Sequence, residues 1–207
     1  MRHIIITGNV AAGKSWILNQ LSHHYPEASI YPEFIHDDPL AHSILKARFN
    51  NSISALTFQN FIMDKWVINS KITPSSINIY ERLPDDAVEV FAKSFLPENE
   101  YETQLNRLTS LSSIPSYKDM NSSNCTWIRY NNDPNQSNIS MLISMISSIT
   151  TTFTVIEVTS PDYYSNYLKR NREGERYSEE DLALMDKAYT SYTSNLIASI
   201  KPTLMTL

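Results

Sequence analysis

The clearest chemical signal in the chain is one short segment: Gly8, Asn9, Val10, Ala11, Ala12, Gly13, Lys14 and Ser15. It fits the pattern G-x-x-x-x-G-K-S/T, in which the glycines let the backbone curl until successive N–H groups point at phosphate oxygens. In this pattern Lys14 reaches the β- and γ-phosphates, and the Ser15 hydroxyl ligates Mg²⁺. The segment predicts a site for ATP with Mg²⁺. The chain has no Asn-Lys-x-Asp sequence to specify guanine, so a GTPase is not expected.

Carboxylates follow two predicted strands. Glu33 comes after the second strand, and Glu81 and Arg82 end the third. The carboxyl ends of parallel strands line the ligand crevice of an open sheet. There Glu33 could accept the proton of an attacking hydroxyl, Glu81 could contact metal-bound water, and Arg82 could stabilise oxyanion charge. A solvated loop acid and an ion-paired strand end would account for the same residues.

A predicted helix places Gln59, Ile62 and Trp66 on one face, with Phe58 beside them. A glutamine among aromatic side chains presents a donor and an acceptor together and could read the edge of a base. On the helix after the third strand, Ala87 and Phe91 lie one turn apart and share a face. These residues would equally suit the apolar face of a core helix.

A basic segment leaves a helix late in the chain, running Lys169-Arg170-Asn171-Arg172-Glu173-Gly174-Glu175-Arg176. Cations that close over a transferring phosphoryl group stabilise its charge in the transition state. Gly174 offers a hinge or turn for such a lid. A solvated charged face remains the alternative.

The elements that must position these residues alternate between strands and helices. Runs rich in β-branched residues predict strands at residues 3–7, 28–31, 77–80 and 153–158, with a short one at 126–130. Helices are predicted at residues 14–24, 39–49, 54–69, 84–95, 100–111, 139–149 and 162–172, and from residue 178 onward. This order predicts one three-layer α/β domain over residues 1–207, with a parallel sheet of about five strands, a lid near 165–177 and a helical C-terminus. Residues 110–138, dense in Ser, Asn, Asp and Pro, are predicted to form an irregular surface excursion.

Composition narrows the class of protein further. The chain has 207 residues, a mass of 23.7 kDa and a net charge of −5. The acidic balance argues against nucleic acid and anionic membranes as partners. Cys125 is the only cysteine and cannot form an internal disulfide. No apolar run is long enough for a signal peptide or a membrane span. We therefore expect a soluble intracellular protein.

In chain order, the phosphate loop, Pro32-Glu33, Phe58-Gln59, Glu81-Arg82 and the basic segment resemble the deoxyribonucleoside kinases. The basic segment and Glu81-Arg82-Leu83-Pro84 look most like herpesvirus-type thymidine kinases, whereas the phosphate loop is similar to that of the cellular enzymes. The resemblance runs from residue 3 to about residue 195 and is weakest over residues 100–138.

The resemblance implies a P-loop kinase fold, a homodimer, and transfer of the γ-phosphoryl of ATP to the 5′-hydroxyl of a deoxynucleoside, with thymidine expected. It implies a cytoplasmic enzyme, in the host cytoplasm if the chain is viral. Each motif also acquires a role. Glu33 would be the general base, Arg82 would stabilise charge near the 5′-oxygen, and Glu81 would organise Mg²⁺ through water. Gln59 would pair with the base, which would lie between Phe58 or Ile62 on one side and Phe91 on the other. Glu175 would contact the 3′-hydroxyl, and Arg170 and Arg172 would be the lid cations.

The chain departs from the family pattern in two places. Asn166 stands where the family has a further lid arginine, and Phe49 stands near the position of a tyrosine that touches the 3′-hydroxyl. Two other positions bear on the base. Trp66 and Ala87 occupy the places where an Arg–Asp pair favours purine and cytosine, which predicts thymidine first and deoxycytidine second. Two other classes stay open: a nucleoside monophosphate kinase of the thymidylate kinase type, and a nucleotide-binding regulator without transfer activity.

Overall fold

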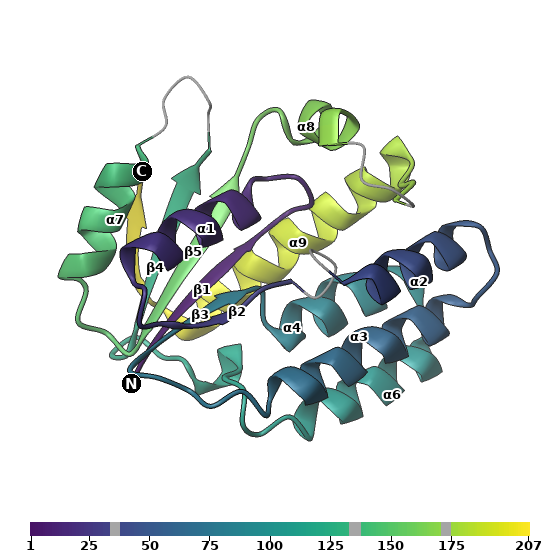
Figure 1. Cartoon of the computed structure of the whole chain (residues 1–207), viewed down its shortest axis with the longest axis horizontal. Coiled ribbons are helices and arrows are strands. Elements are labelled where there is room, and N and C mark those ends of the chain that lie inside the picture. The colour runs from purple at the N-terminus through teal and green to yellow at the C-terminus, as the bar shows by residue number, and fades with distance from the viewer. Residues whose placement is uncertain (34–37, 133–137, 171–174) are drawn as a thin grey trace.

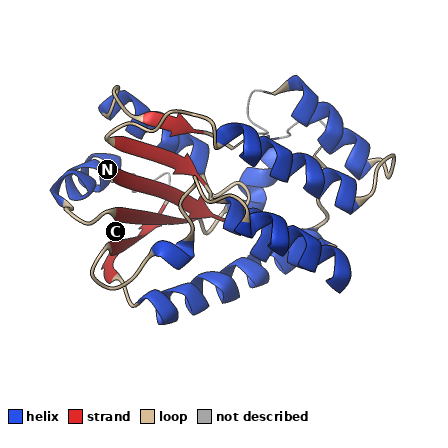
Figure 2. Ribbon diagram, turned by 90° about the horizontal axis from the view of Figure 1, so that it is seen from below, coloured by secondary structure: helices blue, strands red, loops and turns tan. Residues whose placement is uncertain are grey.

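A parallel six-stranded sheet forms the centre of the protein in the computed structural model, which describes all residues except 34–37, 133–137 and 171–174. The strand order is β2-β3-β1-β5-β4-β6, and every neighbouring pair is parallel. The strands are β1 (Arg2–Gly8), β2 (Ser29–Tyr31), β3 (Ile77–Glu81), β4 (Cys125–Asn131), β5 (Phe153–Thr159) and β6 (Thr203–Thr206). Figure 2 shows the strands pointing toward a group of helices that lies beyond their carboxyl ends.

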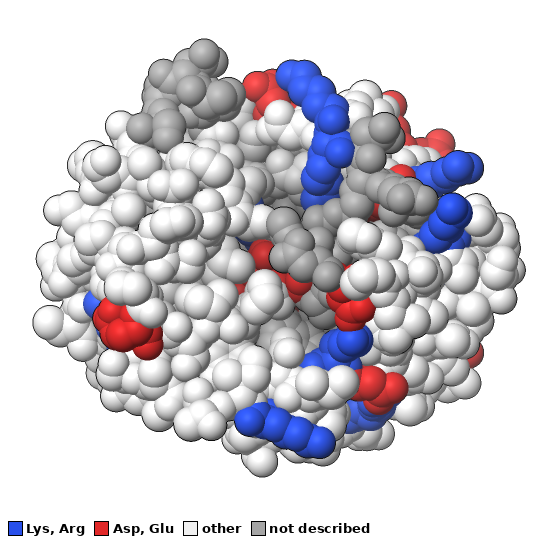
Figure 3. Space-filling model, in the orientation of Figure 1, with Lys and Arg blue, Asp and Glu red and all other residues white. Residues whose placement is uncertain are grey.

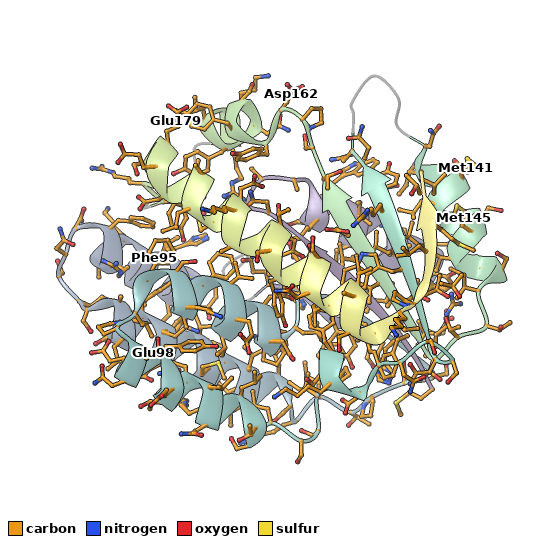
Figure 4. The ribbon with its side chains drawn as sticks, turned by 180° about the vertical axis from the view of Figure 1, so that it is seen from behind. Phe95, Glu98, Met141, Met145, Asp162 and Glu179 are labelled. Atoms are coloured by element: carbon orange, nitrogen blue, oxygen red, sulfur yellow. The ribbon has the colours of Figure 1, made fainter. Side chains whose placement is uncertain are left out.

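Helices cover both faces of the sheet (Figure 1). They are α1 (Lys14–His24), α2 (Pro39–Phe49), α3 (Ala55–Asn69), α4 (Pro84–Asp86), a π-helical turn (Ala87–Ala92), α5 (Lys93–Phe95), α6 (Glu98–Thr109), a 3₁₀ turn (Tyr117–Asp119), α7 (Ile139–Ser148), α8 (Tyr163–Arg170) and α9 (Glu179–Ile200). On one face lie α1 and α7; on the other lie α3, the π-helical turn and α9, which crosses the sheet in the rear view of Figure 4.

The alternation of side chains along β1 divides the core into two layers. Ile4 and Ile6 point into the layer under α1 and α7, whereas Ile5 points into the layer under α3 and α9. All three side chains are fully buried. A strand that is buried on both faces requires an apolar run without polar alternation, as β1 has. The parallel sheet with helices on both faces confirms the predicted three-layer P-loop kinase fold.

The sheet has one strand more than the five predicted. The chain ends in β6 rather than in a helix, and β6 pairs with β4 at the edge of the sheet. The strand is short and mostly exposed, so its sequence carries little of the apolar pattern that marks a buried strand.

Within residues 110–138, of which 133–137 lie outside the described residues, the prediction of an irregular surface excursion is wrong for much of the described part. The expected strand forms as β4, which is longer than predicted and lies inside the sheet between β5 and β6. Trp127 and Ile128 are fully buried on its two faces, and Tyr117 is buried beneath it. The polar composition reflects tight turns, such as the Asn121–Asn124 backbone contacts, between buried apolar residues.

Two further observations complete the fold. Cys125 is fully buried in β4, and burial raises the pKa of its thiol to about 12. Among the described residues, no helix is both long and apolar enough to cross a membrane.

Candidate active site

The phosphate loop joins the end of β1 to the start of α1, as predicted. Its glycines take backbone angles that other residues rarely adopt, with φ of +143° at Gly8 and +98° at Gly13. A Cβ atom on Gly8 would lie 2.3 Å from the Val158 carbonyl oxygen. Ala11 also has a positive φ, of 60°. Local backbone geometry therefore explains why two of the three glycines of the chain lie here.

Lys14 is buried at the base of this loop, where its Nζ donates to the Asn9 carbonyl oxygen at 2.7 Å. The pKa of Lys14 is lowered to about 7, mainly by burial and also by the Arg82 charge, although the Glu33 and Glu81 carboxylates act in the opposite direction. The lysine is thus held in the loop with a pKa near neutrality, and a bound phosphate would favour its protonated form.

Ser15 and Glu81, the two residues predicted to hold Mg²⁺, lie side by side. The Ser15 hydroxyl donates to Glu81 Oε1 at 2.8 Å, and the other carboxylate oxygen accepts the Glu33 N–H at 3.2 Å. A hydroxyl beside a carboxylate is the hard oxygen environment that Mg²⁺ prefers, so these residues fit the ion.

Arg82 and Glu33 meet at the same edge of the sheet, where their side chains form an ion pair. Arg82 has a positive φ of 67°, and its N–H is held by the Ile6 carbonyl oxygen at 2.8 Å. Although burial acts to lower the pKa of Arg82, the Glu33 carboxylate and other acids raise it overall. Its guanidinium lies 4.8 Å from the ring centre of Phe91. The chain thus holds a charged pair where strands β2 and β3 end.

A cavity joins these charges to an apolar wall. The predicted residues that line it are Val10, Lys14, Glu33, Phe58, Ile62, Trp66, Glu81, Arg82, Ala87, Phe91, Arg170 and Glu175. Residues from the phosphate loop to the segment before α9 therefore converge on one site. Figure 3 shows charged side chains of both signs around a hollow in this face of the molecule.

Gln59 is the predicted base-reading residue that does not line this cavity. It is buried, and its Nε2 donates to the Ala87 carbonyl oxygen at 2.9 Å, which ties α3 to the π-helical turn. It lines a second cavity that shares Phe58, Phe91 and Tyr177 with the first. In this arrangement, one of the two N–H donors of the amide is already engaged.

Part of the predicted lid is described. Arg170, at the end of α8, forms an ion pair with Glu175, and its guanidinium lies 6.0 Å from the ring centre of Tyr167. Arg172 and Gly174 lie outside the described residues. Asn166 lines a third cavity together with residues of the phosphate loop, and its Nδ2 donates to the Ser160 hydroxyl at 3.2 Å.

Sequence reasoning missed Tyr177, which lines both the first and the second cavity. Its ring contacts Phe49 edge-on at 4.7 Å between centroids. Tyr177 directly follows the basic segment, and this position is the only sequence feature that could have indicated its place in the site.

A buried polar network beneath the site was also missed. Asp86 accepts the Leu83 N–H at 2.8 Å, the Thr7 hydroxyl at 3.1 Å and the Tyr117 hydroxyl at 3.2 Å. The Tyr189 hydroxyl is hydrogen-bonded to Thr7 from α9. The pair Asp85-Asp86 just after Glu81-Arg82 could have signalled this network, but nothing local marks its tyrosines.

Comparison with known proteins identifies the family. The family model described as "Deoxynucleoside kinase" matches residues 4–133, which include the phosphate loop, Glu33, Gln59 and Glu81-Arg82. No curated protein matches the sequence significantly.

Similar solved structures include deoxyadenosine kinase from M. mycoides in three complexes. With the products dCMP and a flexible dCDP, the TM-score is 0.58 at 17% identity, covering 98% of this chain and 88% of that one. With dCTP, the TM-score is 0.59 at 15% identity, covering 99% of this chain and 89% of that one. With dATP, the TM-score is 0.58 at 15% identity, covering 100% of this chain and 90% of that one. These likenesses establish a shared fold, and the match of the family model over most of the chain shows that the protein belongs to the deoxynucleoside kinase family.

Proposed function

We propose that this kinase transfers the γ-phosphoryl group of ATP to the 5′-hydroxyl of a deoxyribonucleoside, with thymidine as its preferred acceptor. The observation that carries the proposal is the single cavity in which Lys14 and the Glu33–Arg82 pair face an apolar wall of Phe58, Trp66 and neighbouring residues. Such a cavity can bind a flat base at its apolar end and present a sugar hydroxyl to the charged end.

The reaction needs one proton acceptor and several fixed charges. Glu33 takes the proton of the 5′-hydroxyl as the 5′-oxygen bonds to the γ-phosphorus and the bond to the β-phosphate oxygen breaks, which releases ADP. Arg82, held by Glu33 and the Phe91 ring, stabilises charge near the attacking oxygen. Lys14 and Arg170 meet the transferring phosphate, and Arg172 is proposed to do the same. Mg²⁺ held by Ser15 and Glu81 would neutralise charge on the phosphates.

The apolar end of the cavity supports a pyrimidine. Trp66 is only 3% exposed and fills depth that a two-ring base would need, while Ala87 leaves room for a small group such as the thymine methyl. Glu175, beside the cavity and paired with Arg170, is proposed to bind the 3′-hydroxyl. Gln59 would pair with the base after releasing the Ala87 carbonyl oxygen.

The direct test is ADP release from ATP and Mg²⁺ in the presence of a panel of nucleosides and nucleoside monophosphates. We expect turnover with thymidine, less with deoxycytidine and little with purine deoxynucleosides. Lys14→Ala should abolish transfer, because the phosphates lose their buried cation. Glu33→Gln should lower turnover about 100-fold or more while nucleoside binding survives.

The panel also separates this proposal from its rivals. Turnover with monophosphates alone would indicate a nucleoside monophosphate kinase, and nucleotide binding without turnover would indicate a regulator. Near-normal turnover in Glu33→Gln would show that the base is wrongly assigned.

We also propose that the enzyme is a homodimer, an expectation supported by the family resemblance. Light scattering on the purified protein should give twice the chain mass of 23.7 kDa. A monomeric mass at the concentrations used for activity would contradict this.

A further inference from the structure

The phosphate loop is held by two side chains that belong to distant elements. Asn9 donates through Nδ2 to Asp186 Oδ1 of α9 at 2.7 Å. Asn132, just after β4, donates through Nδ2 to the Ala12 carbonyl oxygen at 3.0 Å. The partners are 177 and 120 residues apart in the sequence. Neither Asp186 nor Asn132 lines the cavity that holds the predicted catalytic residues, so each can act on that site only through the loop.

Asp186 orients the first half of the loop. With Nδ2 fixed by Asp186, the Asn9 Oδ1 atom accepts the Val10 N–H at 2.8 Å. The carbonyl oxygen of Asn9 accepts Lys14 Nζ at 2.7 Å, so the resting position of the lysine depends on the same residue. One helical turn after Asp186, the Tyr189 hydroxyl is hydrogen-bonded to Thr7. Helix α9 therefore holds the residues on both sides of Gly8.

Asn132 orients the second half of the loop. Because a peptide unit is planar and trans, its C=O and the following N–H point in opposite directions. By fixing the Ala12 carbonyl, Asn132 also fixes the direction of the Gly13 N–H, one of the donors expected to face phosphate. A Cβ atom on Gly13 would lie 2.1 Å from Asn132 Nδ2. The absence of a side chain at Gly13 is therefore what admits the asparagine.

The loop needs such support because its own conformation is unfavourable. Gly8, Ala11 and Gly13 all have positive φ, and Ala11 carries a Cβ that disfavours this region. A strained segment persists only when its surroundings hold it in place. If contacts from outside the loop supply this hold, less ordering remains for the bound nucleotide to impose, and its affinity is higher.

We propose that Asp186 and Asn132 are positioning residues that hold the phosphate loop in its nucleotide-binding shape before ATP arrives. The proposal rests on the proposed function only in that the loop binds ATP. It assigns a role in donor binding to the end of β4, within the region that the sequence pattern had marked as a surface excursion.

The test measures MgATP affinity by calorimetry in the absence of any acceptor. Asn132→Ala and Asp186→Ala should each weaken MgATP binding by about three- to tenfold, the effect of losing one hydrogen bond. In kinetic assays, the KM for ATP should rise by the same factor, while the KM for the nucleoside stays within about twofold because the base-binding wall is untouched.

Matched controls are available beside each residue. Asn131→Ala removes an exposed neighbour of the same type, and Lys187→Ala removes the exposed residue after Asp186. Both controls should bind MgATP normally. Asp186→Asn keeps an oxygen that can accept from Asn9, so it should restore most of the affinity lost in Asp186→Ala.

Normal MgATP affinity in both alanine variants would overturn the proposal, as would an equal loss of affinity in Asn131→Ala. If Asp186→Ala fails to fold, Asn132→Ala decides the matter, because Asn132 is only partly buried. Since MgATP binding is measured without acceptor, the result stands even if thymidine proves not to be the substrate.

Discussion

Lys14 is the residue at which charge and pH are most directly linked. Burial lowers the pKa of its ammonium group to about 7, and phosphates would raise that pKa on binding. The bound state therefore holds more protons than the free state above pH 7. We predict that MgATP affinity stays level below about pH 7 and weakens above it, by up to about tenfold per pH unit. Calorimetry from pH 6.5 to 8.5 measures this slope.

Lys14→Arg provides the control for that slope, because a guanidinium stays charged throughout this range. Whatever its absolute affinity, this variant should bind MgATP with little pH dependence above pH 7. If both proteins show the same slope, the titrating group is not Lys14.

Trp66 is the residue that bears most on base choice. Trp66→Ala would open the buried end of the cavity, so purine deoxynucleosides should gain in kcat/KM relative to thymidine. Trp66→Phe keeps an aromatic wall and should shift this ratio less. Competition assays with paired nucleosides measure the ratio. A clear preference of the unaltered enzyme for deoxyadenosine or deoxyguanosine would overturn the assignment.

At the scale of elements, an ion pair within the predicted lid joins Arg170, at the end of α8, to Glu175, in the segment that precedes α9. Arg170→Ala and Arg172→Ala should lower kcat more than nucleoside affinity, because the charge they meet grows during transfer. Glu175→Ala should instead raise the KM for the nucleoside and relax discrimination at the 3′-position. Arg176→Ala, at an exposed site, is the control. Unchanged rates in both arginine variants would rule out the lid model.

At the scale of the whole molecule, stability depends on acids buried beneath the site. Burial raises the pKa of Asp85 to about 6; the Ser116 hydroxyl, which donates to it at 2.6 Å, acts against this rise, and Asp86 adds to it. The folded protein therefore binds more protons than the unfolded chain between about pH 4 and pH 6. The stability from this group is complete below the unfolded pKa and is lost as pH rises through 6.

Asp85→Asn cannot ionise, so it should stabilise the protein more at high pH than at low pH. Its gain in unfolding free energy should be about 2 kcal/mol larger at pH 7.5 than at pH 4. Urea unfolding at the two pH values measures the difference, and we expect one cooperative transition, as for a single domain. Glu102→Gln, at an exposed site, should change neither value. A gain that is equal at both pH values would contradict the assigned titration.

The sequence by itself determined the features that depend on a few neighbouring residues. The phosphate loop requires glycine where φ is positive, β1 requires an unbroken apolar run, and α1 begins at the predicted residue. Each is a local steric or burial requirement, so each can be predicted from the sequence without knowledge of the fold. Glu33, Glu81 and Arg82 could be placed at one edge because parallel strands end together.

Tertiary structure decided which side chains reach across the molecule. Gln59 contacts Ala87 rather than lining the first cavity, and Asn132 and Asp186 contact the phosphate loop. These pairings depend on how β4, α3 and α9 pack against the sheet, and packing is a collective property that no local pattern encodes. For the same reason, the sequence pattern did not predict the buried part of residues 110–138. The turns in this region are polar, and only the assembled sheet shows that the residues between the turns fill the core.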